Sequence, residues 1–324
     1  MTAYWQAEED AVRCVLCPHR CRIVPGKAGI CGVRRNRGGT LYAETYGKAA
    51  AVAMDPIEKK PLFHFHPGAR ILSIGSLGCN FRCDFCQNWH LVRHQAPLEE
   101  ARIRDLVEAA RRHGSIGIAY TYNEPLIQFE FVLECSKAIR ASGMKNALVT
   151  NGFVSPEPLE ELLPYVDAMN IDLKSMDPAF YRSVCGGELA PVLETIRAAA
   201  KRTHVELTML LYTGHNDGDA QVREAIDFVA KTDPEIPLHI SRYFPQHRAT
   251  APPTPPARLE AAWRAARERL RYAYVGNLRL PGGEDTSCPH CRAVVVRRSG
   301  YAADASGLSG DRCVSCDARL RFVV

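Results

Sequence analysis

The 324-residue sequence predicts an α/β fold, in which helices cover a mostly parallel sheet. Two observations in residues 71–277 support this class. Short apolar segments of strand length alternate with longer segments in which apolar residues recur every three or four positions. Pro, Ser, Asp and Thr also stand where these helices should begin. Such alternation forms parallel sheets through right-handed crossovers, so chemistry is expected at the carboxyl ends of the strands.

The predicted elements follow one another in order. The strand Ile71–Ser76 precedes a helix with apolar positions from Ile103 to Ala110 and a stop at Gly114. The strand Ile116–Thr121 precedes a helix from Pro125 to Gly143. The further strand candidates are Asn146–Thr150, Ala168–Leu173, Val205–Tyr212, Leu238–Tyr243 and Tyr272–Val275. The further helix starts are Ser155-Pro156, Asp177-Pro178 and Thr254-Pro255. Six or seven units are too few for a closed eight-unit barrel, so a partial barrel and a doubly wound sheet both fit.

Composition restricts the environment and the partners. The net charge of +5 permits an anionic substrate but falls short of a nucleic-acid-binding surface. No apolar run is long enough to span a bilayer, and the polar, acidic N-terminus does not resemble a signal peptide. A cytoplasmic protein is therefore expected, and disulfides are not.

The distribution of the 13 cysteines divides the chain into three parts. Eleven of them form three tight groups with metal-ligand spacing, and only Cys135 and Cys185 stand alone. Residues 1–70 form a cysteine-bearing leader, residues 71–277 contain the strand–helix units, and residues 278–324 form a cysteine-bearing tail.

The central group is Cys79, Cys83 and Cys86, directly after the first strand. Three thiolates at this spacing can wrap around one [4Fe–4S] cluster and leave one iron open to a substrate. The alternative is a zinc site that takes a fourth ligand from His90 or His94. Structural zinc usually has four ligands arranged as two pairs, which this triplet does not offer, so the cluster is favoured.

C-x3-C-x2-C with an aromatic residue, here Phe85, before the last cysteine resembles the signature of the radical S-adenosylmethionine (SAM) superfamily. The resemblance implies a partial (β/α)6 barrel. It also implies that the open iron chelates SAM, whose reductive cleavage yields methionine and a 5′-deoxyadenosyl radical that abstracts hydrogen from a substrate.

The resemblance continues at the ends of the following strands. Tyr122-Asn123-Glu124-Pro125 stands where the family often has Gly-Gly-Glu-Pro, which contacts the amino group of SAM. Glu124 is retained, whereas Tyr122 and Asn123 replace the glycines. Similar segments of glycyl-radical activating enzymes line the SAM site and correspond here to Thr150-Asn151-Gly152 and Asp172-Leu173-Lys174. Thr213–Asp217 resembles the loop near the adenosine. The charges suit SAM, because Glu124 and Asp172 can balance cations and Lys174 can bind a carboxylate.

The leader carries Cys14, Cys17, Cys21 and Cys31, a closed set of four ligands. Zinc and a second iron–sulfur cluster both fit this spacing, with a slight preference for zinc. The leader, the segment Met54–Gly68 and Cys86-Gln87-Asn88-Trp89 together resemble the radical SAM protein of the AmmeMemoRadiSam system. That family implies two companion proteins, of the Memo and AMMECR types.

The tail contains two C-x2-C pairs, Cys288 with Cys291 and Cys313 with Cys316, which predict a zinc-ribbon or rubredoxin-like module. Ala293–Val296 and Leu320–Val323 are expected to be short strands. Zinc is preferred over iron. The second cysteine of each pair usually precedes glycine in such modules, whereas Arg292 and Asp317 stand here.

Three hypotheses for function follow. The first is a radical SAM enzyme acting on a protein or peptide and served by a flavodoxin- or ferredoxin-like reductant. The second is an activating enzyme for a glycyl-radical protein. The third is a non-catalytic adaptor that metals hold together, which has no need for an incomplete ligand set. The histidines His64, His66, His90 and His94 are expected to be ordinary packing or surface residues.

Overall fold

The computed structural model describes residues 2–324, and its centre is a sheet of eight strands in the order β15-β14-β13-β12-β11-β10-β8-β7. All neighbours are parallel except β7, which is antiparallel to β8. The strands are β7 (Ala51–Pro56), β8 (Arg70–Gly75), β10 (Gly117–Tyr120), β11 (Lys145–Thr150), β12 (Ala168–Asp172), β13 (His204–Leu211), β14 (Leu238–Arg242) and β15 (Ala273–Gly276). The edge strands β7 and β15 do not pair with each other, so the sheet is a partial barrel.

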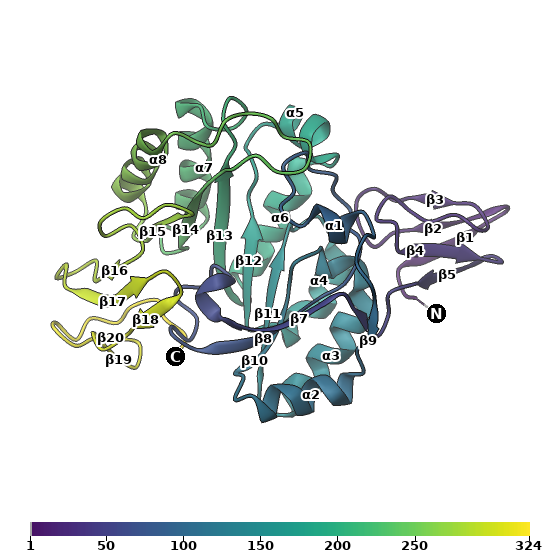
Figure 1. Cartoon of the computed structure of the whole chain (residues 1–324), viewed down its shortest axis with the longest axis horizontal. Helices are drawn as coiled ribbons and strands as arrows, with labels where there is room; N and C mark the ends of the chain where they lie inside the picture. Colours follow the sequence, from purple (N-terminus) through teal and green to yellow (C-terminus); the bar gives the residue numbers. More distant parts are fainter. Residues whose placement is uncertain (1) are drawn as a thin grey trace.

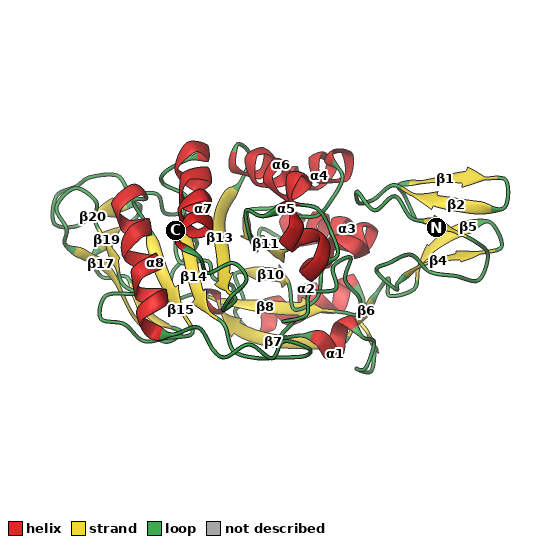
Figure 2. Ribbon diagram, turned by 90° about the horizontal axis from the view of Figure 1, so that it is seen from above, coloured by secondary structure: helices red, strands yellow, loops and turns green. Residues whose placement is uncertain are grey.

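Helices connect the parallel strands and pack on the outer side of the curved sheet (Figure 2). They are α2 (Ile103–Arg112), α3 (Phe129–Ala141), α4 (Pro156–Leu162), α6 (Leu189–Ala200), α7 (Asp219–Thr232) and α8 (Pro256–Arg269). Short helical segments are α1 (Trp89–Val92), α5 (Pro178–Phe180), the 3-10 turns η1 (Ile57–Lys59), η2 (Pro125–Gln128) and η3 (Leu163–Tyr165), and the π-helical turn η4 (Tyr181–Cys185). No described helix is long and apolar enough to cross a membrane.

The alternation predicted from the sequence is confirmed, and the partial barrel is correct rather than the doubly wound sheet. The helix predicted to start at Asp177-Pro178 does start there, with Asp177 capping α5, which continues into η4. The chain becomes left-handed at Gly186, and a second helix, α6, starts at Leu189. One prediction was wrong in detail. Leu320–Val323 is not a strand, because Val323 makes an isolated bridge to Phe65 instead of pairing within the tail.

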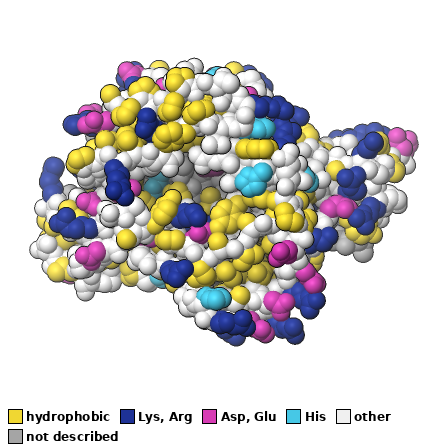
Figure 3. Space-filling view, in the orientation of Figure 1, with side chains coloured by type: hydrophobic (Ala, Val, Ile, Leu, Met, Phe, Trp, Pro, Cys, Tyr) yellow, Lys and Arg dark blue, Asp and Glu magenta, His cyan; other side chains and the backbone are white. Residues whose placement is uncertain are grey.

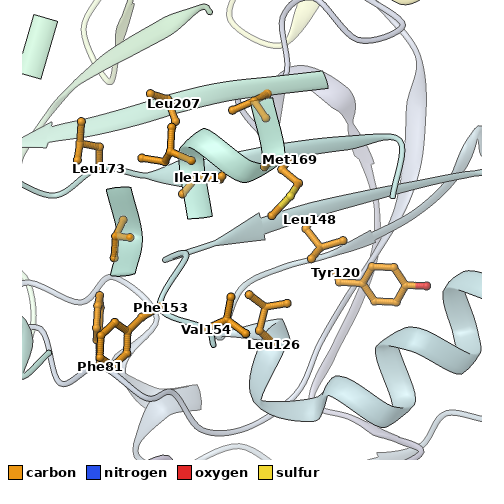
Figure 4. Close-up of a cluster of buried hydrophobic side chains, with 14 of the residues drawn as sticks. Phe81, Tyr120, Leu126, Leu148, Phe153, Val154, Met169, Ile171, Leu173 and Leu207 are labelled. Carbon is orange, nitrogen blue, oxygen red and sulfur yellow. The ribbon is translucent and has the colours of Figure 1, made fainter. Parts of the chain in front are cut away.

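The main core lies between the sheet and the helices (Figure 4). Leu148, Ile171 and Leu207 come from three neighbouring strands and are fully buried. Phe81, from the central cysteine loop, lies against Phe153, with ring centroids 5.1 Å apart. The loop that carries the central cysteines is therefore anchored in the main core.

Small sheets lie at the two ends of the molecule, the leader strands in purple and the tail strands in yellow (Figure 1). The leader strands are β1 (Trp5–Glu8), β2 (Ala11–Cys14), β3 (Arg22–Ile23), β4 (Arg34–Arg37), β5 (Thr40–Ala43) and β6 (Lys48–Ala49), which pairs with β9 (Glu99–Glu100). The tail strands are β16 (Thr286–Ser287), β17 (Val294–Ser299), β18 (Ala302–Asp304), β19 (Leu308–Ser309) and β20 (Arg312–Cys313).

The segment between β7 and β8 joins the tail to the barrel. The buried His64 accepts from or donates to the Tyr274 hydroxyl through Nε2 at 2.5 Å, and its Nδ1 lies 2.7 Å from the Arg321 carbonyl oxygen. Arg298 of β17 donates to the Phe63 carbonyl at 2.6 Å. As expected from the sequence, His64 is a packing residue.

Candidate functional site

The central cysteines lie on the loop that follows β8, at the carboxyl end of the parallel strands. Their thiols line a cavity of about 830 Å³, a size that accommodates a ligand such as SAM. The same cavity is lined by all the residues expected from the ends of the next three strands: Asn123, Glu124, Thr150, Asn151, Asp172 and Lys174. The structure therefore brings the three cysteines and these six residues to one cavity.

The side chain of Asn123 fixes the start of the cysteine loop. Its Oδ1 accepts from the Ser76 amide at 2.8 Å, and its Nδ2 donates to the carbonyls of Leu77 and Gly78 at 3.2 and 3.1 Å. The glycine of the family motif could not make these bonds. The departure from that motif thus has a physical role, which is to tie the end of β10 to the loop after β8.

The side-chain amide of Asn151, at the end of β11, also contacts the cysteine loop. It donates to Asn80 Oδ1 at 2.9 Å and to Cys79 Sγ at 3.6 Å. The Phe81 amide also donates to Cys79 Sγ, at 3.3 Å. Hydrogen bonds to sulfur stabilise a thiolate and tune the potential of an iron–sulfur centre. Burial and the nearby Glu124 carboxylate nevertheless raise the pKa of Cys79 well above its usual value, so these donors supply only part of the stabilisation that a thiolate ligand needs.

The charges around Cys83 also favour a thiolate. A hydrogen bond from the Cys185 thiol and the nearby Lys174 ammonium hold the pKa of Cys83 below its usual value, against the effect of burial. Cys185 reaches this position from the π-helical turn η4, and no motif in the sequence pointed to this role. Among the residues that line the cavity, neither His90 nor His94 is present to serve as a fourth ligand of zinc.

Glu124 is buried at the centre of the strand ends. Its carboxylate accepts hydrogen bonds from Thr150 Oγ1 at 2.7 Å, from the backbone N–H of Asn151 at 2.8 Å and from the backbone N–H of Leu126 at 3.0 Å. Burial raises the pKa of Glu124 to about 7, although these three donors oppose the shift. Because both oxygens are engaged by the protein, Glu124 joins the ends of β10 and β11 and positions the residues around it.

Asp172 and Lys174 form an ion pair at the end of β12, with Nζ 2.9 Å from Oδ2. Burial opposes the charge of Lys174, but the Asp172 carboxylate raises the pKa of the lysine well above its usual value. The pair therefore offers both a cation and an anion to a zwitterionic ligand. The loop 213–217 does not line the cavity; its Asn216 donates to the Lys174 carbonyl at 2.6 Å.

Other cavity residues were not predicted as site residues. Segment 57–63 contributes Glu58, Lys60 and Phe63, β14 contributes His239, and the tail contributes Tyr301. These groups are distant in sequence from the cysteine motif, and only the folded chain brings them to one cavity. On the face shown in Figure 3, hydrophobic side chains are exposed over the middle and most acidic side chains lie toward the edges.

The leader cysteines line a separate small cavity of about 10 Å³. Besides Cys14, Cys17, Cys21 and Cys31, it is lined by Leu16, His19, Ile23, Gly29, Arg34 and Ile127. The four cysteines thus meet in one place, as their spacing suggested.

The tail cysteines form a tight group, whose four sulfurs all lie within 4.8 Å of one another. Cys288 and Cys316 are 3.7 Å apart, and Cys291 and Cys313 are 3.6 Å apart. A tetrahedral metal with bonds of about 2.3 Å to sulfur requires sulfurs roughly 3.8 Å apart, so the group fits one zinc or iron ion. Arg292 and Asp317 adopt the left-handed backbone (φ 66° and 58°) that glycine usually supplies in such modules.

Comparison with known proteins agrees with this geometry. The sequence pattern of the radical SAM superfamily matches residues 73–229. A protein of Methanocaldococcus jannaschii of uncharacterised function is 41% identical, over 99% of this chain and 98% of the relative. The chain belongs to the radical SAM superfamily. Membership implies a SAM-dependent radical enzyme with a [4Fe–4S] cluster.

Other relatives of this radical SAM protein are activating enzymes. The 4-hydroxyphenylacetate decarboxylase activating enzyme of Clostridium scatologenes is 30% identical over 36% of this chain and 38% of its own length. The pyruvate formate-lyase 1-activating enzyme of Escherichia coli K12 is 28% identical over 50% of this chain and 69% of its own. Streptococcus suis SuiB bound to SAM shares the fold, with a TM-score of 0.52 at 15% identity over 68% of this chain and 53% of SuiB.

Proposed function

We propose that this radical SAM protein holds its [4Fe–4S] cluster on Cys79, Cys83 and Cys86 and binds SAM in the adjoining cavity. The observation that carries the proposal is the convergence of the three thiols and the ends of β10, β11 and β12 on that cavity. With both groups bound and one electron added, the site supplies a 5′-deoxyadenosyl radical for hydrogen abstraction. We assign this chemistry to residues 71–277, flanked by the leader 1–70 and the tail 278–324.

The residues around the cavity have separable tasks in this proposal. Asn123 and Asn151 hold the cysteine loop in place through the bonds described above. Lys174 offers its ammonium to the carboxylate of SAM, and Asp172 offers a negative charge to its cationic groups. Glu124 and Thr150 act by positioning, because they bond to each other at 2.7 Å.

The test is anaerobic reconstitution with iron and sulfide, followed by dithionite and SAM. We expect 5′-deoxyadenosine to form, and we expect the Cys83→Ala variant to form none. A Cys135→Ala variant is the matched control, because Cys135 is buried in α3 away from the cavity. A wild type that forms no 5′-deoxyadenosine above the background of Cys83→Ala would refute the proposal. That result would favour the adaptor hypothesis, in which the metals only hold the protein together.

We infer that the substrate is a protein or peptide. The names of the relatives support this, because they describe enzymes that activate other enzymes. The second candidate, a glycyl-radical activating enzyme, rests on the same relatives. It predicts a glycyl radical signal in EPR spectra of a co-purifying partner after reaction with SAM. Absence of that signal while 5′-deoxyadenosine still forms would favour another peptide substrate.

The remaining partners are proposed on resemblance. We propose a flavodoxin- or ferredoxin-like reductant, Memo-like and AMMECR-like companions, a cytoplasmic location and zinc in the tail. Co-purification from the native host, with zinc and iron counted per chain, tests these assignments. We expect the tail to bind one metal ion. Replacement of Cys288 and Cys316 by serine should remove that ion without any loss of acid-labile sulfide.

A further inference from the structure

The leader site and the central cysteine loop are in direct contact. His19, which stands between Cys17 and Cys21, places its Nε2 2.8 Å from the carbonyl oxygen of Asn80. On the other side, a Cβ on Gly78 would lie only 2.5 Å from the carbonyl oxygen of Cys31. Two ligand segments of the leader therefore press against the residues on both sides of Cys79.

The spacing of the leader sulfurs differs from that of a single-metal site. Among residues 2–324, the tail cysteines are the one group of three or more ligand atoms that all lie within 4.8 Å of one another. No three leader sulfurs meet this condition, and neither does the central triplet. The leader sulfurs therefore lack the close mutual spacing that the tail offers to a single metal ion.

A buried cation stands beside the leader cysteines. Arg34 is 1% exposed, lines the leader cavity and forms an ion pair with Glu130, with Nη1 2.8 Å from Oε2. Its two terminal nitrogens are bonded to Glu130 and to backbone oxygens, but its buried Nε has no partner among the described residues. A donor of this kind, next to four thiols, fits an anionic thiolate-bound group.

We propose that Cys14, Cys17, Cys21 and Cys31 hold a second [4Fe–4S] cluster, which passes electrons to the cluster on the central triplet. A reduced one-electron donor protein loses one electron, and the leader cluster takes it and goes from the 2+ to the 1+ state. The leader cluster returns to 2+ when the triplet cluster goes from 2+ to 1+, and no bond or proton changes place. The presence of the second cluster is independent of the function proposed above, whereas the relay rests on that function.

The first test counts iron, zinc and acid-labile sulfide after anaerobic reconstitution. The variant Cys79→Ala/Cys83→Ala/Cys86→Ala isolates the leader, and we expect it to keep about four sulfides per chain and an EPR signal after reduction by dithionite. The sulfide content distinguishes a cluster from a single-metal site, because neither a zinc site nor a single-iron site in the tail contains acid-labile sulfide. A triplet variant with no sulfide and two zinc ions per chain would overturn the proposal.

The two proposals fail in different ways. The variant Cys14→Ala/Cys17→Ala should keep about four sulfides and an EPR signal that changes when SAM is added. If SAM changes no signal in the wild type while the triplet variant keeps its sulfide, the proposed function fails and the second cluster stands. Should the leader variant not fold, Arg34→Gln serves instead. It removes the buried cation, so the midpoint potential of the leader signal should fall while that of the triplet stays in place.

The relay is tested by the rate at which the triplet cluster is reduced, followed by rapid-freeze EPR. With reduced flavodoxin as donor, we expect the rate in Cys14→Ala/Cys17→Ala to fall at least tenfold relative to the wild type. With dithionite, which is small enough to reach the open cavity, the rates should agree within twofold. Equal rates with flavodoxin would overturn the relay.

Discussion

At the scale of single residues, the contact between the leader and the central cysteine loop depends on a missing side chain. Gly78 has a φ of 86°, a conformation that side chains disfavour. It also has no space for one, since a Cβ would lie 2.5 Å from the Cys31 carbonyl oxygen and 2.8 Å from Val33 Cγ1. Two separate costs therefore apply at this position, one of backbone strain and one of collision.

The variants Gly78→Ala and Gly143→Ala separate these costs. Gly143 has a similar φ of 76°, but nothing lies within 4 Å of its added Cβ. We expect Gly143→Ala to lower the free energy of unfolding by about 1 kcal/mol, from strain alone. Gly78→Ala should cost about 3 kcal/mol, since collision in a packed site adds to the strain. Urea unfolding of the reconstituted proteins measures both, and equal losses would show that the leader does not press on the loop.

At the scale of elements, β17 attaches the tail to the rest of the molecule through one buried arginine. The Arg298 guanidinium donates to the Phe63 carbonyl at 2.6 Å, to Thr286 Oγ1 at 2.8 Å and to the Glu284 carbonyl at 3.0 Å. Its Nε also lies 3.9 Å from the buried carboxylate of Glu58. The loss of a buried cation leaves these acceptors and Glu58 uncompensated.

Arg297 and Arg298 are neighbours in β17, and replacing each of them by alanine tests how much the buried arginine stabilises the protein. We expect Arg298→Ala to lower the free energy of unfolding by about 3–5 kcal/mol, as is usual for breaking a buried ion pair. Arg297→Ala, which removes an exposed side chain of the same strand, should change it by less than about 0.5 kcal/mol. Limited proteolysis between residues 277 and 290 should be faster in Arg298→Ala alone. Equal cleavage of both variants would mean that Arg298 does not dock the tail.

At the scale of the whole molecule, the sequence predicts what local patterns determine. The order of strands and helices follows from hydrophobic periodicity, and parallel strands place Glu124, Asn151 and Asp172 at one edge. No local pattern predicts the hydrogen bond from Asn123 to the cysteine loop, because it joins two loops more than 40 residues apart in the sequence.

The features that the sequence did not predict concern long-range pairing. β7 joins the sheet from the leader, and the sequence offered no sign of this because its residues do not alternate clearly between buried and exposed. Val323 bridges to Phe65 across almost the whole chain. Several short apolar segments could pair with the edge of the sheet. The assembled barrel determines which of them does so, and the local spacing of residues therefore could not predict the pairing.

His64 is a titratable group at which three parts of the molecule meet: the segment between β7 and β8, the barrel and the tail. His64 is fully buried, and its Nδ1 faces the Arg321 carbonyl, which can only accept a hydrogen bond. Nδ1 therefore carries the proton of the neutral ring, and Nε2 accepts from the Tyr274 hydroxyl, which lies 2.7 Å from Thr286 of the tail. Burial lowers the pKa of His64 to about 3, although nearby Glu206 opposes the shift.

This arrangement makes the docking of the tail sensitive to acid. Between pH 3 and about 6.5 the unfolded chain binds a proton at His64 and the folded protein does not. The contribution to stability is therefore complete above pH 6.5 and is lost as the pH falls, by about 1.4 kcal/mol per pH unit. We expect urea unfolding of the wild type to show this loss between pH 6.5 and 5.5. The variant His64→Gln should be less stable at pH 7.5 but should lose less over the same interval, because its amide does not titrate. Parallel pH profiles for the two proteins would show that His64 is protonated in the folded state as readily as in the unfolded chain, and that the contacts of its two ring nitrogens do not govern the docking of the tail.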